Sequence, residues 1–375
     1  MLDFQNMYRA YRRAAAGKRD KQEVIDFELD LSRNLWEIIH QMEAKTYRVG
    51  GYHKFMIYDP KERKIEALSF RDRVVQHCLC DNILKPYFEN RLIHDNVACR
   101  EGKGTDFARD RLTEFLREHY KKHGTNGYIL KYDIRHYFDS IDHEILKWML
   151  RSIPDRNVLG LLYHIIKSYD GTTDPVTGRK KGLPLGNQTS QWFALYYLDP
   201  MDRLIKEKMR IKHYVRYMDD GIMVHESKEY LKEVLTQMRK KAKELHLEFN
   251  EKTQILPISE GVDFLGFRFY LTDTGKVILM DESLYLNGRN LSRSDYSLEN
   301  GREMRIGLGD IAPGESKIVR YTLRFKNDAS SSETYTNTAC AAGENGEAFS
   351  SFTVSITGSP LTTEEHLQLF AGTQT

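Results

Sequence analysis

The segment KHYVRYMDDGIMVH, residues 212–225, decides the fold that this chain is expected to adopt. On both sides of its two acids, side chains alternate as they do along a half-buried strand, whose successive residues point to opposite faces. Asp219, Asp220 and Gly221 make a turn signal, so the segment predicts a β-hairpin with the acids at its tip. Two neighbouring carboxylates repel, and both stay ionised at low cost only with a cation between them. A solvated hairpin tip without function is the simpler alternative.

A second acidic position follows another predicted strand. Residues 128–132, YILKY, form an apolar run that ends at Asp133, and Asp142 behind it is expected to cap a helix. Asp133 would supply a third carboxylate, and Mg²⁺ favours a few carboxylates together with phosphate oxygens. Two such ions can serve the attacking and leaving oxygens of a phosphoryl transfer. Without such a role, Asp133 would be a surface acid or a helix cap.

Other segments place these acids in a mixed fold. In GLPLGNQTSQ, residues 182–191, Gly186 lets the backbone approach a ligand closely and Asn187 is expected to start a helix, although an ordinary loop before a helix is the alternative. Residues 231–245 repeat apolar side chains at helical spacing, and residues 260–279 predict two strands around a turn. The chain up to about residue 275 is therefore expected to be α+β.

The composition fits a folded chain of two domains. Of 375 residues, 40% are apolar and 29% are charged, and the net charge of +2 combines +5 over residues 1–300 with −3 over residues 301–375. This balance does not by itself indicate a nucleic-acid binder. No apolar run is long enough to span a membrane, so no membrane partner is expected. The four cysteines fit buried thiols in a reducing cytosol, and not a zinc site or disulfides.

The order of the motifs resembles that of the reverse transcriptases. Asp133 followed after four residues by Phe138, then LPLGNQTSQ, YMDD, FNEKT and FLGFRF, resemble motifs A to E of that family over residues 1–270. The resemblance implies the fingers and palm of a right-hand polymerase and a cytoplasmic RNA-directed DNA polymerase. It further implies template RNA, a primer and deoxynucleoside triphosphates as partners, and two Mg²⁺ ions, with Mn²⁺ as an alternative, held by Asp133, Asp219 and Asp220.

The resemblance also assigns roles to other residues. Lys252 matches the lysine that protonates departing pyrophosphate, and Phe138 matches the steric gate against a ribose 2′-hydroxyl, with Tyr137 as second choice. A surface lysine and a core aromatic are the plain alternatives. Arg63, followed by Lys61, is the candidate for gripping the triphosphate, because a guanidinium pairs with phosphate bidentately. The nucleotide site is completed by Ile134, Leu185 and Gly186, and the primer–template contacts are expected from Arg71, Arg73, Gln191, Phe264, Leu265 and Gly266, with Phe267 beside them.

Motif B indicates which type of reverse transcriptase the chain resembles most. Many family members have Gln before the glycine of motif B and Pro at its end, whereas this chain has Leu185 and Gln191. The resulting LGxxxSQ pattern resembles reverse transcriptases of diversity-generating retroelements, which make errors at adenines and work with a small accessory protein. Low fidelity is therefore expected. The alternatives are a group II intron-like, retron-like or phage-defence reverse transcriptase, or a non-catalytic scaffold.

The C-terminal part departs from the family. Residues 276–300 are too short for the usual helical thumb and are interpreted as a linker or thumb remnant. Residues 301–375 are rich in Thr, Ser, Val and Gly in short alternating runs, which predict an all-β, immunoglobulin-like sandwich segment with a loose tail. Residues 334–358 resemble repeats of bacterial surface proteins. The predicted domains are therefore residues 1–275 as fingers and palm, followed by the linker and the β segment.

Overall fold

A computed structural model describes residues 3–58 and 62–281 of the chain, and beyond them the strand residues between 285 and 371. Contacts divide the chain into two units. The first unit comprises Met1–Ala108, Lys131–Met223 and Glu229–Gln254, and the second comprises Arg109–Leu130, Val224–Lys228 and Ile255–Thr375.

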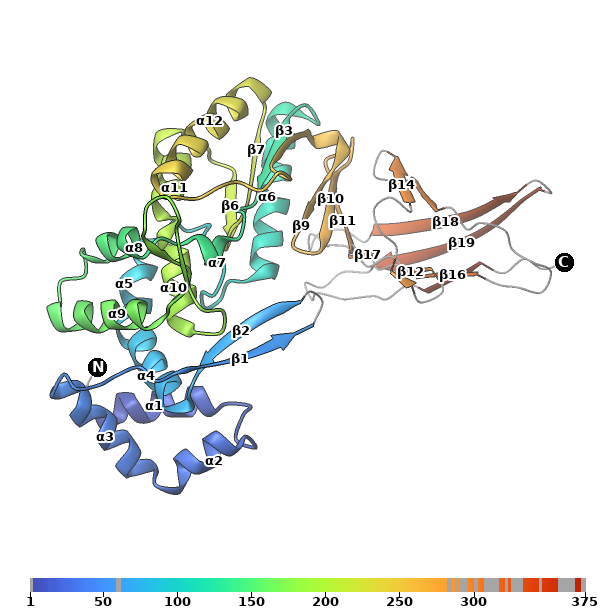
Figure 1. Ribbon diagram of the computed structural model, residues 1–375. Coiled ribbons are helices and arrows are strands. Elements are labelled where there is room, and N and C mark those ends of the chain that lie inside the picture. The colour runs from blue at the N-terminus through green and yellow to red at the C-terminus, as the bar shows by residue number, and fades with distance from the viewer. Residues whose placement is uncertain are drawn as a thin grey trace. The chain divides into compact units, whose positions relative to one another are not determined.

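Four helices form the N-terminal core of the first unit: α1 (Phe4–Ala15), α2 (Gln22–Leu29), α3 (Leu31–Glu43) and α4 (Phe70–Leu79). Figure 1 shows α1, α2 and α3 gathered beside α4. Apolar side chains recur at three- and four-residue spacing along these helices, so each helix buries one stripe against the others. The buried residues of this core include Met7, Tyr11, Val24, Leu35, Ile38, Val74 and Val75.

A two-stranded hairpin extends from these helices. Strand β1 (Tyr52–Ile57) pairs antiparallel with β2 (Arg63–Leu68), in a register that sets Tyr52 opposite Leu68 and Ile57 opposite Arg63. Its base is attached to the rest of the unit, because the backbone N–H of Glu66 donates to the carbonyl of Leu185 at 3.1 Å. The Glu66 carboxylate is buried and accepts a hydrogen bond from the Tyr169 hydroxyl.

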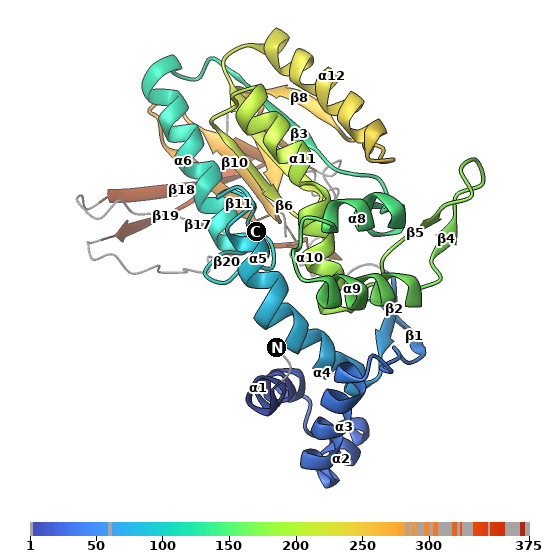
Figure 2. The same ribbon diagram turned by 90° about the vertical axis from the view of Figure 1, so that its left-hand side faces the viewer.

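A four-stranded sheet carries the acids. Its strands are β6 (Tyr214–Tyr217), β7 (Asp220–His225), β3 (Tyr128–Tyr132) and β8 (Gln254–Pro257), in that order. Figure 2 shows α10 and α11 running beside β6, where hydrogen bonds join these helices to the strand. The bounds of these and other helices are α5 (Lys85–Glu89), α6 (Thr105–His123), α7 (Tyr137–Ser140), α8 (His143–Leu150), α9 (Arg156–Ser168), α10 (Gln188–Tyr197), α11 (Asp199–Arg203) and α12 (Lys228–Glu244), with π-helical turns η1 (Cys80–Leu84) and η2 (Leu204–Lys208) and the short pair β4 (Thr172–Thr173) and β5 (Lys180–Lys181).

The second unit contains a sheet in the order β17-β11-β10-β9. Within this unit, α6 supports the sheet: the Arg109 guanidinium lies 4.5 Å from the centre of the Phe267 ring, and the Tyr120 hydroxyl donates to the carbonyl of Asp273 at 2.6 Å. The strands are β9 (Val262–Phe264), β10 (Phe267–Leu271), β11 (Val277–Asp281), β12 (Tyr285–Leu286), β13 (Arg289–Asn290), β14 (Tyr296–Glu299), β15 (Glu303–Ile306), β16 (Lys317–Arg320), β17 (Leu323–Arg324), β18 (Glu333–Gly343), β19 (Gly346–Ile356) and β20 (Gln368–Ala371), with the 3₁₀ turn η3 (Ile258–Glu260).

Most predicted elements are present. The strand before Asp133, the helix after Asp142 and the helix after Asn187 are all formed, and Asp142 caps α8 by accepting from the backbone N–H of Glu144 and Ile145. Helices and strands mix as the α+β prediction requires. Residues 260–279 form three strands where two were expected, because a tight turn at Leu265 and Gly266 precedes the predicted one.

The C-terminal prediction is tested only in part. Strands β18 and β19 form an antiparallel ribbon between Glu333 and Ile356, where alternation predicted strands. The immunoglobulin-like sandwich falls largely on residues outside those described and stays a prediction, as do the domain boundaries. Of the cysteines that the structure describes, Cys78 and Cys80 are buried thiols as expected, whereas Cys99 is exposed.

Among the helices that the structure describes, none combines the length and apolar character that a bilayer-spanning segment needs.

Candidate active site

The two acids of the hairpin lie at a tighter turn than the sequence suggested. Tyr217 pairs with Asp220, so Met218 and Asp219 are the two central residues of the turn and Asp220 already begins β7. The hairpin is present as expected and Asp219 lies at its tip, whereas Asp220, also expected at the tip, belongs to β7. Met218 has a φ of 53°, a left-handed conformation that costs free energy for a residue with a side chain. The surroundings must therefore hold this turn in place.

Gly221 was expected in the turn, but it is a strand residue that allows a close contact between β7 and β3. It lies inside β7, opposite Arg216, and a Cβ atom there would stand 2.2 Å from ring carbons of Tyr132 on β3. Only a residue without a side chain allows β7 to approach Tyr132 so closely. Because Tyr132 directly precedes Asp133, this contact sets the spacing between the two acid-bearing segments.

The structure brings Asp133 and Asp219 together. Their carboxyl groups share a hydrogen bond, and Asp219 is partly buried. Burial, followed by the nearby charges of Asp133 and Asp220, raises the pKa of Asp219 from its ordinary value of 3.8 to about 7. Keeping Asp219 ionised in this environment therefore costs free energy, which a nearby cation would offset.

This arrangement fits a divalent cation that is completed by a substrate. In the part of the chain that the structure describes, no set of three or more Asp, Glu, His or Cys side chains is arranged to hold an ion by itself. Mg²⁺ is commonly bound by one or two protein carboxylates together with phosphate oxygens and water. A cation bound beside Asp133 and Asp219 would offset the unfavourable negative charge that contributes to the raised pKa of Asp219.

Motifs A and B are joined by backbone hydrogen bonds. The N–H of Leu183 donates to the carbonyl of Phe138 at 2.8 Å, and the N–H of Gly182 donates to the carbonyl of Ile141 at 2.9 Å. Phe138 is half-buried, whereas Tyr137 is only 3% exposed and donates its hydroxyl to the carbonyl of Ala194. Of the two aromatic residues, only Phe138 therefore retains an accessible face.

The loop at Gly186 lies against the β1–β2 hairpin. Gly186 has a φ of 113°, and a Cβ there would lie 3.1 Å from Cγ2 of Ile65, so the position favours glycine on both counts. Leu185 beside it is half-buried, and Gln191 is exposed on the first turn of α10. Ile134 is 1% exposed, backbone included, and its place in the nucleotide site stays a prediction.

Lys252 lies in a turn attached to Asp133. The N–H of Asn250 donates to the carbonyl of Asp133 at 2.8 Å, and the side-chain oxygen of Asn250 accepts from the N–H of Lys252 at 3.1 Å. The Lys252 side chain is exposed. One residue, Asn250, thus connects the predicted proton donor to a predicted metal ligand.

The fingers residues give a mixed result. Lys61 and the side chain of Arg63 lie outside the described residues. Arg71 donates to the side chain of Gln41 and lies over the Tyr47 ring, and Arg73 pairs with Glu23. These internal partners reduce the charge that Arg71 and Arg73 could present to a template, and their assignment stays a prediction.

The predicted primer-grip residues belong to the second unit. Phe264 is 1% exposed and pairs with Phe267 across the β9–β10 turn, where Leu265 and Gly266 both have positive φ. The turn is thus a tight hairpin with an apolar base. Its contact with a primer remains a prediction.

Sequence reasoning missed the residues that support the acids. Arg216 and Asp202 are fully buried and form an ion pair, and Tyr132 and Gly221 meet as described above. The alternation in residues 214–218 does place Arg216 on the same face as Tyr214, which is a signal of burial. The partner on α11 cannot be identified from that pattern.

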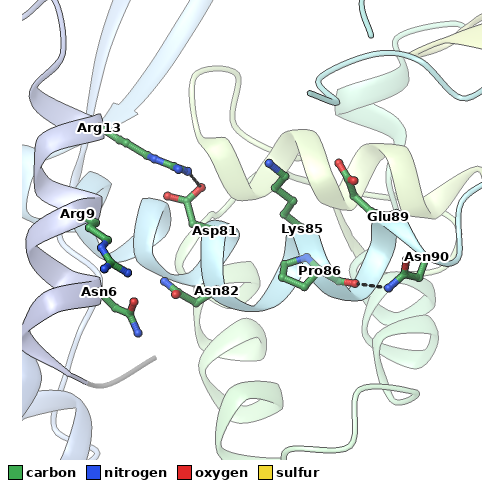
Figure 3. Close-up of a pocket in the computed structure, with 9 residues that line it drawn as sticks. All are labelled: Asn6, Arg9, Arg13, Asp81, Asn82, Lys85, Pro86, Glu89 and Asn90. Atoms are coloured by element: carbon green, nitrogen blue, oxygen red, sulfur yellow. Dashed lines mark hydrogen bonds and ion pairs between the residues drawn. The ribbon is translucent and has the colours of Figure 1, made fainter. Parts of the chain in front are cut away.

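A separate polar cavity lies between α1 and the segment η1–α5. It has a volume of about 370 Å³ and is shown in Figure 3. Arg13 on its α1 side forms an ion pair with Asp81 at 2.7 Å. None of its residues belongs to the predicted site; they are Asn6, Arg9, Arg13, Asp81, Asn82, Lys85, Pro86, Glu89 and Asn90.

Comparison with solved structures finds matches to telomerases. Apo telomerase from Candida tropicalis has a TM-score of 0.47 and 14% identity, with 63% of this chain and 49% of that chain covered. Telomerase from Candida albicans in complex with the TWJ fragment of telomeric RNA has a TM-score of 0.43 and 14% identity, with 60% and 45% covered. This chain thus spans about half the length of those telomerases. No curated protein matches it in sequence.

The comparison with protein families gives the broader result. The family model described as reverse transcriptase (RNA-dependent DNA polymerase) matches residues 58–269, which is more than half of the chain. The match includes the strand before Asp133, the loop at Gly186 and the turn at Asp219. The chain therefore belongs to the reverse transcriptase family, the RNA-dependent DNA polymerases.

Proposed function

We propose that this chain copies RNA into DNA by two-metal nucleotidyl transfer at Asp133, Asp219 and Asp220. The observation that carries the proposal is the shared hydrogen bond between Asp133 and Asp219, together with the raised pKa of Asp219. Such a partly buried acidic pair is unfavourable without a cation and is expected where a cation acts.

The acids would hold two Mg²⁺ ions together with the phosphates of an incoming nucleotide. When bound, the ions supply positive charge to the transferring phosphoryl group and to the oxygens that attack and leave. Lys252, on the turn that is anchored to Asp133, would donate a proton to the leaving pyrophosphate. Lys61 and Arg63 of the fingers hairpin would hold the triphosphate.

The nucleotide would lie between motif A and motif B. Phe138 presents an accessible aromatic face, and its carbonyl accepts a hydrogen bond from the N–H of Leu183. This hydrogen bond holds the backbone of Phe138 beside motif B. A bulky ring at this position leaves neither space nor a hydrogen-bonding partner for a 2′-hydroxyl. The exposed Gly186 would let the backbone approach the base or sugar.

Motif B supports error-prone copying of the type found in diversity-generating retroelements. Leu185 is half-buried and apolar, so it cannot hydrogen-bond to a nucleotide as glutamine could. A site without that hydrogen bond discriminates less strongly between substrates. A small accessory protein is proposed as a further partner, template RNA and primer as the nucleic-acid partners, and the cytoplasm as the location.

Replacing Asp219 tests the proposed activity. Asp219→Asn is expected to lower primer extension on poly(rA)/oligo(dT) with Mg²⁺ by about 10³-fold, because a metal contributes several kcal/mol of charge stabilisation. The control is Asp139→Asn, an exposed acid on α7, which should retain activity. A wild-type chain that is inactive with its RNA and protein partners, and unchanged by Asp219→Asn, would favour a non-catalytic scaffold.

Replacing Phe138 tests the steric gate. Phe138→Ala is expected to increase incorporation of ribonucleotides relative to deoxynucleotides by about tenfold or more, since a steric block worth 1.4 kcal/mol gives a factor of ten. The ratio of kcat/KM for UTP and dTTP measures the effect. Tyr137→Phe is the matched control, because its ring stays in the core. An unchanged ratio in Phe138→Ala would remove this role.

The pH dependence of stability tests the acidic pair without activity. Because the folded-state pKa of Asp219 lies above its ordinary value, the group stabilises the fold at acid pH, and that contribution is lost as the pH rises from about 4 to 7. Metal-free Asp219→Asn should therefore melt several degrees above wild type at pH 8 and close to it at pH 4.

Added Mg²⁺ should raise the wild-type melting temperature at pH 8 more than that of the variant. Asp20→Asn, an exposed acid between α1 and α2, serves as the control. Equal melting temperatures for wild type and Asp219→Asn at pH 8 would contradict the buried acidic pair.

The proposed low fidelity is tested by the products. Sequencing cDNA made in vitro on a defined RNA should show more errors opposite adenines than opposite other bases. Leu185→Gln is expected to lower the error rate, because it restores a hydrogen-bonding side chain beside the nucleotide. Adenine error rates equal to those at the other bases would remove the assignment to diversity-generating retroelements.

A further inference from the structure

We propose that Arg216, paired with Asp202, is a positioning residue that fixes the turn carrying Asp219. The proposal rests on the proposed function, since the turn matters only if its acids bind metal ions. Arg216 directly precedes the acidic motif and has no accessible surface, and neither does Asp202.

The ion pair has the geometry of a fork. Nη2 of Arg216 lies 2.6 Å from Oδ2 of Asp202, and Nε lies 2.8 Å from Oδ1. Nη2 also donates to the carbonyl of Leu195 on α10 at 3.1 Å. The guanidinium is thereby held in a single orientation by two helices, as a planar bidentate group can be.

The third nitrogen of this guanidinium, Nη1, contacts the turn. Nη1 of Arg216 donates to the carbonyl of Met218 at 2.5 Å. Met218 is the residue with the unfavourable positive φ, and its carbonyl belongs to the peptide that leads into Asp219. This hydrogen bond therefore opposes relaxation of the strained residue and fixes the direction in which Asp219 leaves the backbone.

Asp202 connects the same ion pair to the other acidic segment. Its Oδ1 accepts from the Tyr214 hydroxyl at 2.7 Å, and the hydroxyls of Tyr214 and Tyr132 lie 2.6 Å apart. Tyr132 directly precedes Asp133. One buried carboxylate therefore organises the backbone next to both Asp133 and Asp219.

Stability alone does not explain the pair. Two buried charges cost desolvation free energy, and well-packed apolar residues in their place are often equally stable or more stable. An apolar pair could fill the space but could not hold the Met218 carbonyl. The function of the pair is then expected to appear in metal affinity and rate, and not in the melting temperature.

The test compares two variants with wild type. Arg216→Lys retains the charge but cannot form the fork, and Arg216→Met combined with Asp202→Leu removes both charges together. Mn²⁺ alone is titrated by electron paramagnetic resonance, primer extension on poly(rA)/oligo(dT) is measured against Mg²⁺ concentration, and thermal unfolding is recorded. The control is Arg203→Lys, because Arg203 pairs with Asp199 on the same helix and is 43% exposed.

Both variants are expected to bind Mn²⁺ about 10- to 100-fold more weakly and to lose kcat by a similar factor, as when residues that orient metal ligands are replaced. High Mg²⁺ should restore part of the rate of Arg216→Lys. The double variant should melt at or above the wild-type temperature, and Arg203→Lys should match wild type in binding and rate.

A folded double variant that binds Mn²⁺ and extends primers like wild type would overturn the positioning role. If the double variant does not fold, unchanged Mn²⁺ affinity in Arg216→Lys overturns it equally. These results differ from failure of the proposed function, in which wild type itself neither binds Mn²⁺ nor extends a primer.

Discussion

The repulsion between Asp133 and Asp219 is the constraint around which the first unit is organised. Two carboxyl groups meet in a partly buried place where water screens their charges poorly, so the fold must hold them together against a tendency to separate. The backbone of each acid is held in place by its neighbours. Asp133 follows a buried strand and its carbonyl is bonded to Asn250, whereas Asp219 lies in a two-residue turn.

The supports of the two acids are continuous with the core. Tyrosine hydroxyls, an arginine and an aspartate join β3 and β6 to α10 and α11 through hydrogen bonds that are fully buried. Tyr132, Tyr214, Asp202 and Arg216 each have a hydrogen-bond partner in this network, which is the condition under which buried polar groups add rigidity. Asp133 and Asp219 thus lie next to the regular strands β3 and β7, and the backbone strain in this hairpin is at Met218 in the turn.

Local patterns in the sequence predicted the elements that bear the site. Alternation predicted the hairpin, the apolar run predicted the strand before Asp133, and Asp142 indicated the start of α8. Asp-Asp-Gly is a strong local turn signal, but in the structure Asp220 and Gly221 belong to β7, where Gly221 is in contact with Tyr132. That contact joins residues far apart in the chain, so no local pattern contains it.

Charged residues were the least predictable part of the site. Arg71 and Arg73 were assigned to the template by resemblance, yet both have partners within the N-terminal helices. Arg216, in contrast, is completely buried beside Asp202. A single sequence does not say which acid an arginine will meet, because that depends on helices packed from elsewhere in the chain.

The contact between Gly221 and Tyr132 has a consequence for how this sequence can vary. A side chain at position 221 requires a smaller residue at 132, and a smaller residue at 132 gives up the hydroxyl that meets Tyr214. Tyr132 therefore prevents the replacement of Gly221 alone. Replacing both residues removes the hydrogen bond between Tyr132 and Tyr214 that connects β3 to Asp202. The residues at positions 132, 214 and 221 are therefore expected to be replaced together and not one at a time.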